Sequence, residues 1–186
     1  MKSMVLFLLV AALTGCKTTP VTSVPTSESF VESVNYSEVM GKKLYDEISS
    51  GNSTEEHTSR EKDLIDMGRN LLCGGEYRAV SIYDNLNIEN IYILSIPPSS
   101  EGIQFGRHLK FRFREGSNNI IDVAPSTKTC IVVPTGDGGM PYITHLMSET
   151  PSEYHVFLSL YHKVNIYVGT SSGTWKVEAG KVSKVS

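Results

Sequence analysis

The chain has 186 residues, and its 17 Lys and Arg against 20 Asp and Glu give a formal net charge of −3. This length suits a single domain with one hydrophobic core. The near balance of charge excludes the strongly basic class of nucleic-acid-binding proteins, so we predict no nucleic acid partner.

An apolar segment lies near the start of the chain. Lys2 precedes residues 4–13, which read MVLFLLVAAL, and about ten apolar residues are typical of the central part of a signal peptide. A membrane-spanning helix needs about 20 apolar residues, whereas Lys17 and a polar stretch interrupt this pattern at once. We therefore predict that residues 1–15 form a signal peptide.

Residues 13–16 read LTGC and resemble the lipobox of bacterial lipoproteins. The resemblance implies cleavage before Cys16 and acylation of its thiol and of the new amino terminus. Several acyl chains on one residue exceed what stable membrane anchoring requires. Lys17, in place of aspartate, implies sorting to the outer membrane, where we expect the chain to face the periplasm. The alternative is a soluble secreted protein that is cut elsewhere.

Two further cysteines remain in the mature chain, Cys73 and Cys130. An even pair in an oxidising compartment favours a disulfide. The bridge would close a loop of about 58 residues, which the chain-entropy model values at roughly 4 kcal/mol. We predict a structural disulfide, and two buried free thiols are the alternative.

The first part of the mature chain divides into a tether and a helical region. Residues 17–34 are rich in Ser, Thr and Pro, so we predict that residues 16–35 are a flexible tether. Residues 36–73 are predicted to be helical, with one helix over 36–50 and a second from Ser53, which forms a capping box with Glu56. The apolar positions that support the two helices are Val39, Met40, Leu44 and Ile48, and then Leu64, Gly68, Leu71 and Leu72.

The hydrophobic period changes to two from Tyr77 onward, which predicts strands over residues 77–179. Turn signals separate the runs YRAVSIY (77–83), IENIYILSI (88–96), RHLKFRFR (107–114), NIIDV (119–123), TCIVVP (129–134), YITHLMS (142–148), YHVFLSLY (154–161), VNIYVG (164–169) and TWKVEAG (174–180). The predicted class is α+β, with the two helices packed on a mainly antiparallel β-sandwich or curved sheet. Residues 36–186 would form one globular domain.

Cations alternate with apolar residues between Arg107 and Arg114. On a strand, successive side chains point to opposite faces, so Leu109, Phe111 and Phe113 should enter the core while the cations face out. One interpretation is a solvated face that discourages edge pairing. The other is a docking surface for an acidic protein, formed by Lys110, Arg112 and Arg114.

The histidines and the glycine-rich turn give no metal or phosphate site. His145, His155 and His162 lack the spacing of zinc ligands, so we predict scattered surface histidines and no metal. The stretch TGDGG (135–139) lacks the lysine of a phosphate-binding loop, which favours a turn between strands. We predict no cofactor.

A catalytic constellation is also missing from the sequence. There is no G-x-S-x-G motif, and the cysteines are better used as a bridge, so we predict that the protein is not an enzyme. Carboxylates near turns could still meet in space, which keeps a hydrolytic function as an alternative. Trp175 and the tyrosines Tyr154, Tyr161 and Tyr167 are assigned to packing, with a glycan platform as the alternative. The carboxylates near turns are Asp84, Glu89, Asp122, Asp137 and Glu149.

A second resemblance covers residues 105–178. The stretch NNIIDVAPSTKTCIVVPTGDG (118–138) is similar to small periplasmic lipoproteins assigned to type VI secretion immunity. The departures are the helical segment before Tyr77 and the lack of a second cysteine in the later half. The resemblance implies a compact β domain that binds and blocks a periplasmic toxin. The alternative is a pilot or assembly lipoprotein of a secretion or pilus system.

Overall fold

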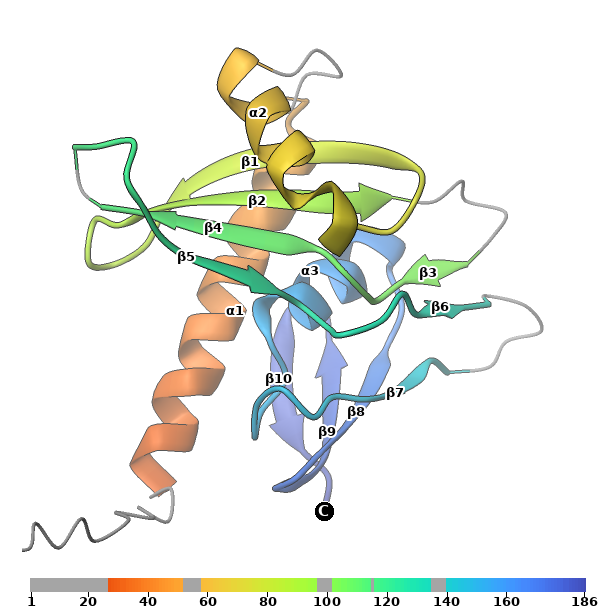
Figure 1. Cartoon of the computed structure of the whole chain (residues 1–186). Helices are drawn as coiled ribbons and strands as arrows, with labels where there is room; N and C mark the ends of the chain where they lie inside the picture. The colour runs from red at the N-terminus through yellow and green to blue at the C-terminus, as the bar shows by residue number, and fades with distance from the viewer. Residues whose placement is uncertain (1–26, 52–57, 97–101, 115, 135–139) are drawn as a thin grey trace, which may run out of the picture.

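The computed structural model describes residues 27–51, 58–96, 102–114, 116–134 and 140–186 (Figure 1). The predictions for the signal peptide, for Cys16, for the Ser53–Glu56 capping box and for the glycine-rich turn at 135–139 lie outside these residues. The helices are α1 (Ser27–Ser49), α2 (Ser59–Gly68), a 3-10 turn (Arg69–Leu71) and α3 (Glu153–His162). The strands are β1 (Glu76–Tyr83), β2 (Glu89–Ile96), β3 (Ile103–Gln104), β4 (Leu109–Phe113), β5 (Ile120–Pro125), β6 (Val132–Val133), β7 (Tyr142–Thr144), β8 (Ile166–Thr170), β9 (Gly173–Glu178) and β10 (Lys181–Lys184).

The strands form two four-stranded sheets and one short ribbon. The first sheet has the order β1-β2-β4-β5 and is antiparallel throughout. The second has the order β10-β9-β8-β7, in which only the pairing of β7 with β8 is parallel. Strands β3 and β6 pair with each other. The mixture of helices and mainly antiparallel sheets confirms the predicted α+β class.

Helix α1 begins at Ser27, well before Tyr36, where the sequence placed the start of the domain. The last part of the predicted tether, residues 27–35, is therefore helical. These first turns also pack on the domain: the ring of Phe30 lies 6.5 Å from that of Trp175, and the hydroxyls of Ser33 and Thr150 are 2.7 Å apart. Sequence periodicity missed them because they carry few apolar residues.

Helix α2 covers one face of the first sheet. Its N-cap is Thr58, whose side chain accepts from the backbone of Glu61 while the Glu61 carboxylate accepts from the Thr58 amide. Leu64 and Ile65 are buried in the same apolar cluster as the side chains of β4 that face this helix. Those side chains of β4 are Leu109, Phe111 and Phe113.

Residues 153–162 form helix α3, so the prediction of a strand over YHVFLSLY was wrong. Ser152 precedes the helix in an extended conformation, and Lys163 ends it with a φ of 55°. Every side chain from Glu153 to Ser159 is buried. A helix that is buried on all sides has no polar face, so its hydrophobic period cannot be told from that of a buried strand.

Helix α3 lies between the two four-stranded sheets (Figure 1). Its Tyr154 ring is 5.8 Å from the ring of Tyr92 in β2, and the hydroxyl of Ser159 donates to the carbonyl of Val177 in β9 at 3.4 Å. Direct packing of one sheet on the other is therefore not confirmed. Helix α1 approaches α3 closely at Gly41, where a Cβ atom would lie 2.6 Å from the carbonyl oxygen of Glu153.

Candidate functional site

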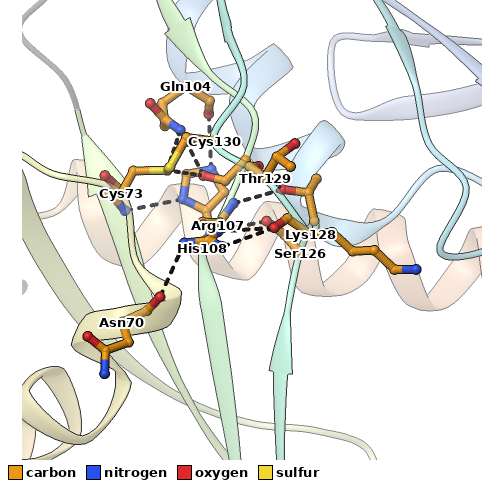
Figure 2. Close-up of a disulfide and its surroundings, with 12 residues drawn as sticks. Asn70, Cys73, Gln104, Arg107, His108, Ser126, Lys128, Thr129 and Cys130 are labelled. Carbon is orange, nitrogen blue, oxygen red and sulfur yellow. Dashed lines mark hydrogen bonds between the residues drawn. A yellow bond between two sulfur atoms is a disulfide. The ribbon is translucent and has the colours of Figure 1, made fainter.

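A disulfide joins Cys73 to Cys130, as predicted, with their Cα atoms 5.7 Å apart (Figure 2). It links the segment after α2 to the segment before β6. The side-chain amide of Gln104 donates to the Cys73 sulfur at 3.0 Å and to the carbonyl of Gly106 at 2.8 Å. The bridge is thus embedded in a network that fixes residues 104–108 against the chain around Cys130.

Arg107 ties the same region together (Figure 2). Its guanidinium donates to the carbonyl of Asn70 at 3.2 Å, and to the carbonyl of Lys128 at 3.2 and 3.1 Å. All three hydrogen bonds that the guanidinium donates end on neutral carbonyl oxygens. Arg107 therefore brings a positive charge to this region that no carboxylate of the described residues neutralises.

An ion pair lies inside the domain, between β4 and α3. The Lys110 ammonium is 2.7 Å from Oε1 of Glu153, and the two side chains are only 16% and 7% exposed. The rings of Tyr36 and Tyr92 lie 5.6 and 5.8 Å from the ammonium. Burial by itself lowers the pKa of Lys110, but the charge of Glu153 and the neighbouring Tyr36 outweigh this effect and raise it. Lys110 therefore stays charged.

The predicted outward row of cations on β4 needs correction. The alternation is present, and the apolar side chains of β4 are buried as expected. However, His108 is completely buried and Lys110 is committed to Glu153, because the second face of this sheet is covered as well. Arg112 is half-buried and Arg114 is exposed. Contact of these cations with a partner remains a prediction.

The prediction of scattered surface histidines was wrong for His145 and His155, which are buried, and His108 is buried as well. The rings of His145 and His155 are 4.8 Å apart. Nδ1 of His108 accepts from the amide of Ser95 at 3.2 Å, and its Nε2 lies 3.0 Å from the carbonyl of Gln104, so the neutral ring with Nε2–H satisfies both. Burial lowers the pKa of all three, in the case of His108 to about 4.

The tyrosines beside the ion pair also stay neutral. Burial, with the nearby charge of Glu153 as the second cause, raises the pKa of both Tyr92 and Tyr154 far above the ordinary value. The hydroxyl of Tyr92 donates to Glu153 at 3.4 Å. Lys110 and Tyr92 thus hold a largely buried carboxylate in place, which suits a structural role.

Two of the carboxylates that the sequence placed near turns are held by local contacts, and a third, Asp137, lies outside the described residues. Asp84 accepts from the amides of Leu86 and Ile88 in its own turn, and Glu89 is held by Arg60 at 3.0 and 2.9 Å. Within the described ranges, no group of three or more His, Cys, Asp or Glu could hold a metal ion. In the same part of the chain, no helix is long and apolar enough to cross a membrane.

Apolar side chains are exposed along β7 and the turn that follows it. Buried Pro141, Ile143 and His145 alternate with outward positions, as a strand requires. The outward face of an antiparallel or edge strand is normally polar. The outward positions of β7 itself are Tyr142 and Thr144, and further apolar side chains are exposed just before and just after the strand. Met140, Tyr142, Leu146 and Met147 are 64%, 57%, 78% and 51% exposed; we call these four side chains the β7 surface.

Tyr142 lies across the neighbouring strand. Gly169 of β8 has no side chain, and a Cβ atom there would come within 3.2 Å of Cζ of Tyr142. The glycine therefore makes room for the ring on the sheet. The other side of the ring is left open to solvent, which gives the β7 surface a rigid aromatic element.

A pocket of about 210 Å³ adjoins the β7 surface. It lies between the chain around Lys128 and the turn after β7, and Leu146 and Met147 belong to its wall. Buried His145 also lines it, and Nδ1 of this ring has no hydrogen-bond partner among the described residues. The pocket is large enough for one apolar side chain and carries a cation at its rim.

The β7 surface and Glu153 were both missed from the sequence. The sequence held only a partial signal for the first: Tyr142 and Leu146, two of the alternate positions of YITHLMS, are aromatic or apolar, whereas Thr144 and Ser148 at the other two are polar. Glu153 was missed because a strand was predicted over residues 154–161, which placed Glu153 in a turn instead of in a helix.

Comparison with known proteins gives no relative for this chain. No family model, no curated protein and no solved structure matches it.

Proposed function

We propose that this protein is a lipoprotein, held at the outer membrane by acyl chains on Cys16, whose domain binds another protein and catalyses no reaction. The observation that carries the binding role is the β7 surface. Single exposed apolar residues are normal, whereas a group of them close together is typical of an interaction site. Met and Tyr are also enriched at protein interfaces.

The domain is suited to binding by its rigidity. A disulfide holds the chain beside the pocket, and an internal ion pair joins the first sheet to α3. A surface that is fixed before binding loses less conformational entropy on association. The resemblance of residues 105–178 to immunity lipoproteins leads us to propose a periplasmic toxin as the partner.

The reach of the anchor follows from the start of α1. Ten residues, 17–26, separate Cys16 from Ser27, and at about 3.5 Å each they span at most about 35 Å. The domain would therefore work close to the bilayer.

Site-specific photo-crosslinking tests the binding role. A photoreactive amino acid replaces Tyr142 or Leu146 in the full chain, produced in the bacterium that encodes it, and Asp63 on the exposed side of α2 is the matched control position. We expect one dominant protein adduct from positions 142 and 146 and none from 63. No adduct from any position, or equal adducts from all three, would overturn the proposal. If the partner is a toxin, production of that partner should kill cells that lack this protein.

A further inference from the structure

Among the described strands, none pairs with the outer edge of β7. The carbonyl of Pro141 accepts from the amide of Tyr167, and the amide of His145 donates to the carbonyl of Gly169, both at 2.8 Å. In a parallel ladder, alternate residues point their backbone groups to the same neighbour. The N–H and C=O groups of Tyr142 and Thr144 therefore point away from β8, and no described residue pairs with them.

The opposite edge of the same sheet is protected. On β10, the amide of Val182 donates to a carboxylate oxygen of Glu38 at 2.8 Å, and Lys181 pairs with the same carboxylate at 2.7 Å. Lysines and covering elements are the usual means of blocking an edge against strand addition. Among the described residues, β7 itself carries no lysine and no strand covers its outer edge, and the exposed side chains just before and after it are apolar.

The charge beside this edge is positive. The side chain of Lys128 extends away from the disulfide region (Figure 2), and it forms no ion pair with a carboxylate of the described residues. Arg107, bonded to the Lys128 carbonyl, adds a second cation whose acceptors are neutral. Electrostatic complementarity calls for a carboxylate on the partner.

We propose that β7 accepts an extended, acidic segment of a partner protein as an additional strand. Backbone hydrogen bonds form to Tyr142 and Thr144, an apolar side chain of the segment enters the pocket beside Leu146, and a carboxylate lies near Lys128. Strand addition of this kind obtains affinity from the backbone and specificity from pockets for alternate side chains. The inference rests on the proposed protein-binding function and names the chemistry of its partner.

Synthetic peptides test the chemistry without knowledge of the partner. The probe is a capped ten-residue peptide of alternating Val and Glu, added at about 1 mM, a concentration that detects binding free energies of about −4 kcal/mol. Its matched controls are the Val and Lys counterpart, and the Val and Glu peptide methylated on alternate backbone nitrogens. The readout is amide hydrogen exchange in the full chain at Tyr142 and Thr144, with the already bonded amide of Val182 as the internal reference.

We expect the acidic peptide to slow exchange at Tyr142 and Thr144 at least about twofold, as half occupancy at this concentration requires, with no change at Val182. The lysine peptide and the peptide methylated on its edge-facing amides should have no effect. Lys128→Glu should weaken the acidic peptide about 5- to 10-fold and allow the lysine peptide to bind. Equal binding of both peptides, insensitivity to methylation, or no protection by any of them would overturn the proposal.

Two further outcomes separate this inference from the proposed function. If position 142 gives an adduct but the acidic peptide does not protect the amides of Tyr142 and Thr144, strand addition is wrong and the protein-binding function still stands. Protection that rises with protein concentration in the absence of peptide would assign the edge to a second copy of this chain and overturn the acidic partner.

Discussion

Lys110 of β4 and Glu153 of α3 lie 2.7 Å apart inside the domain, with the rings of Tyr36 and Tyr92 beside them. The pair joins the first sheet to the helix that separates it from the second. It also uses a lysine from a strand whose pattern predicts an outward cation. The two charges are buried together, so each depends on the other for its solvation.

Loss of either charge should therefore be costly. We expect Lys110→Met or Glu153→Gln to lower the free energy of unfolding by about 3–5 kcal/mol each, because the remaining group is left buried without its partner. The double variant should lose much less than the sum of the two. Urea denaturation measures all three. The more exposed pair of Lys176 and Glu178, whose side chains are 27% and 52% exposed, is the control, and Lys176→Ala should change little. Additive single effects would mean that the pair is not coupled.

Acid should destabilise the domain through its buried histidines. The pKa of His108 is about 4 in the folded chain and about 6.5 when unfolded, so the unfolded state binds more protons between these values. The stabilisation is complete above pH 6.5 and is lost as the pH falls toward 4. For His108 alone the loss is on the order of 3 kcal/mol. His145 and His155, whose pKa values burial also lowers, add to it.

Stability curves from pH 7.5 to 4 measure this dependence. His108→Leu should flatten part of it, although the amide of Ser95 and the carbonyl of Gln104 then lose their partner and the variant is less stable at pH 7 by about 1–3 kcal/mol. A slope that is the same in both chains would show that His108 is not responsible.

Much of the fold could be predicted where one local signal was enough. The spacing of Met40, Leu44 and Ile48 predicted the buried face of α1, although Val39 of the same pattern is 44% exposed, and an even pair of cysteines predicted the bridge between Cys73 and Cys130. The change of period near Tyr77 marked the beginning of the strands. Each of these signals depends only on residues that are close in sequence or on the even number of cysteines.

The rest depends on what covers each surface, which the sequence does not state. The alternation on β4 correctly divided Phe111 from Lys110, but it gave the second face to solvent. In the structure, α2 covers one face of this sheet, while α1 and α3 share a buried cluster with the other. The contact between His145 and His155 likewise depends on the position of α3 between the two four-stranded sheets.

The close approach of α1 to α3 gives a prediction at Gly41. A methyl group there would lie 2.5 Å from Cβ of Val156 and 2.6 Å from the carbonyl of Glu153, so the helices must separate. We expect Gly41→Ala to lower the free energy of unfolding by about 1–3 kcal/mol. Gly74→Ala is the matched control, because nothing lies within 4 Å of its added carbon. Equal stability of the two variants would contradict the close packing.

Membrane attachment should depend on one sulfur atom. We expect the full chain to be recovered with the outer membrane and to incorporate labelled palmitate, whereas Cys16→Ala should do neither, because the thiol is the acceptor of the acyl chains. Fractionation of cells that produce each chain checks this. An unlabelled chain, or a Cys16→Ala variant that still sediments with the membrane, would exclude lipid anchoring.

Reduction of the disulfide should weaken both the fold and the β7 pocket. The bridge closes a loop that runs from Cys73 to Cys130, and its loss is expected to cost up to roughly 4 kcal/mol. Cys130 directly follows Thr127, Lys128 and Thr129, which line the pocket, so the acidic peptide should also bind less well. The Cys73→Ser/Cys130→Ser double variant should match the reduced chain and be insensitive to reductant. Two alkylatable thiols at these positions in denatured, unreduced protein would rule out the bridge.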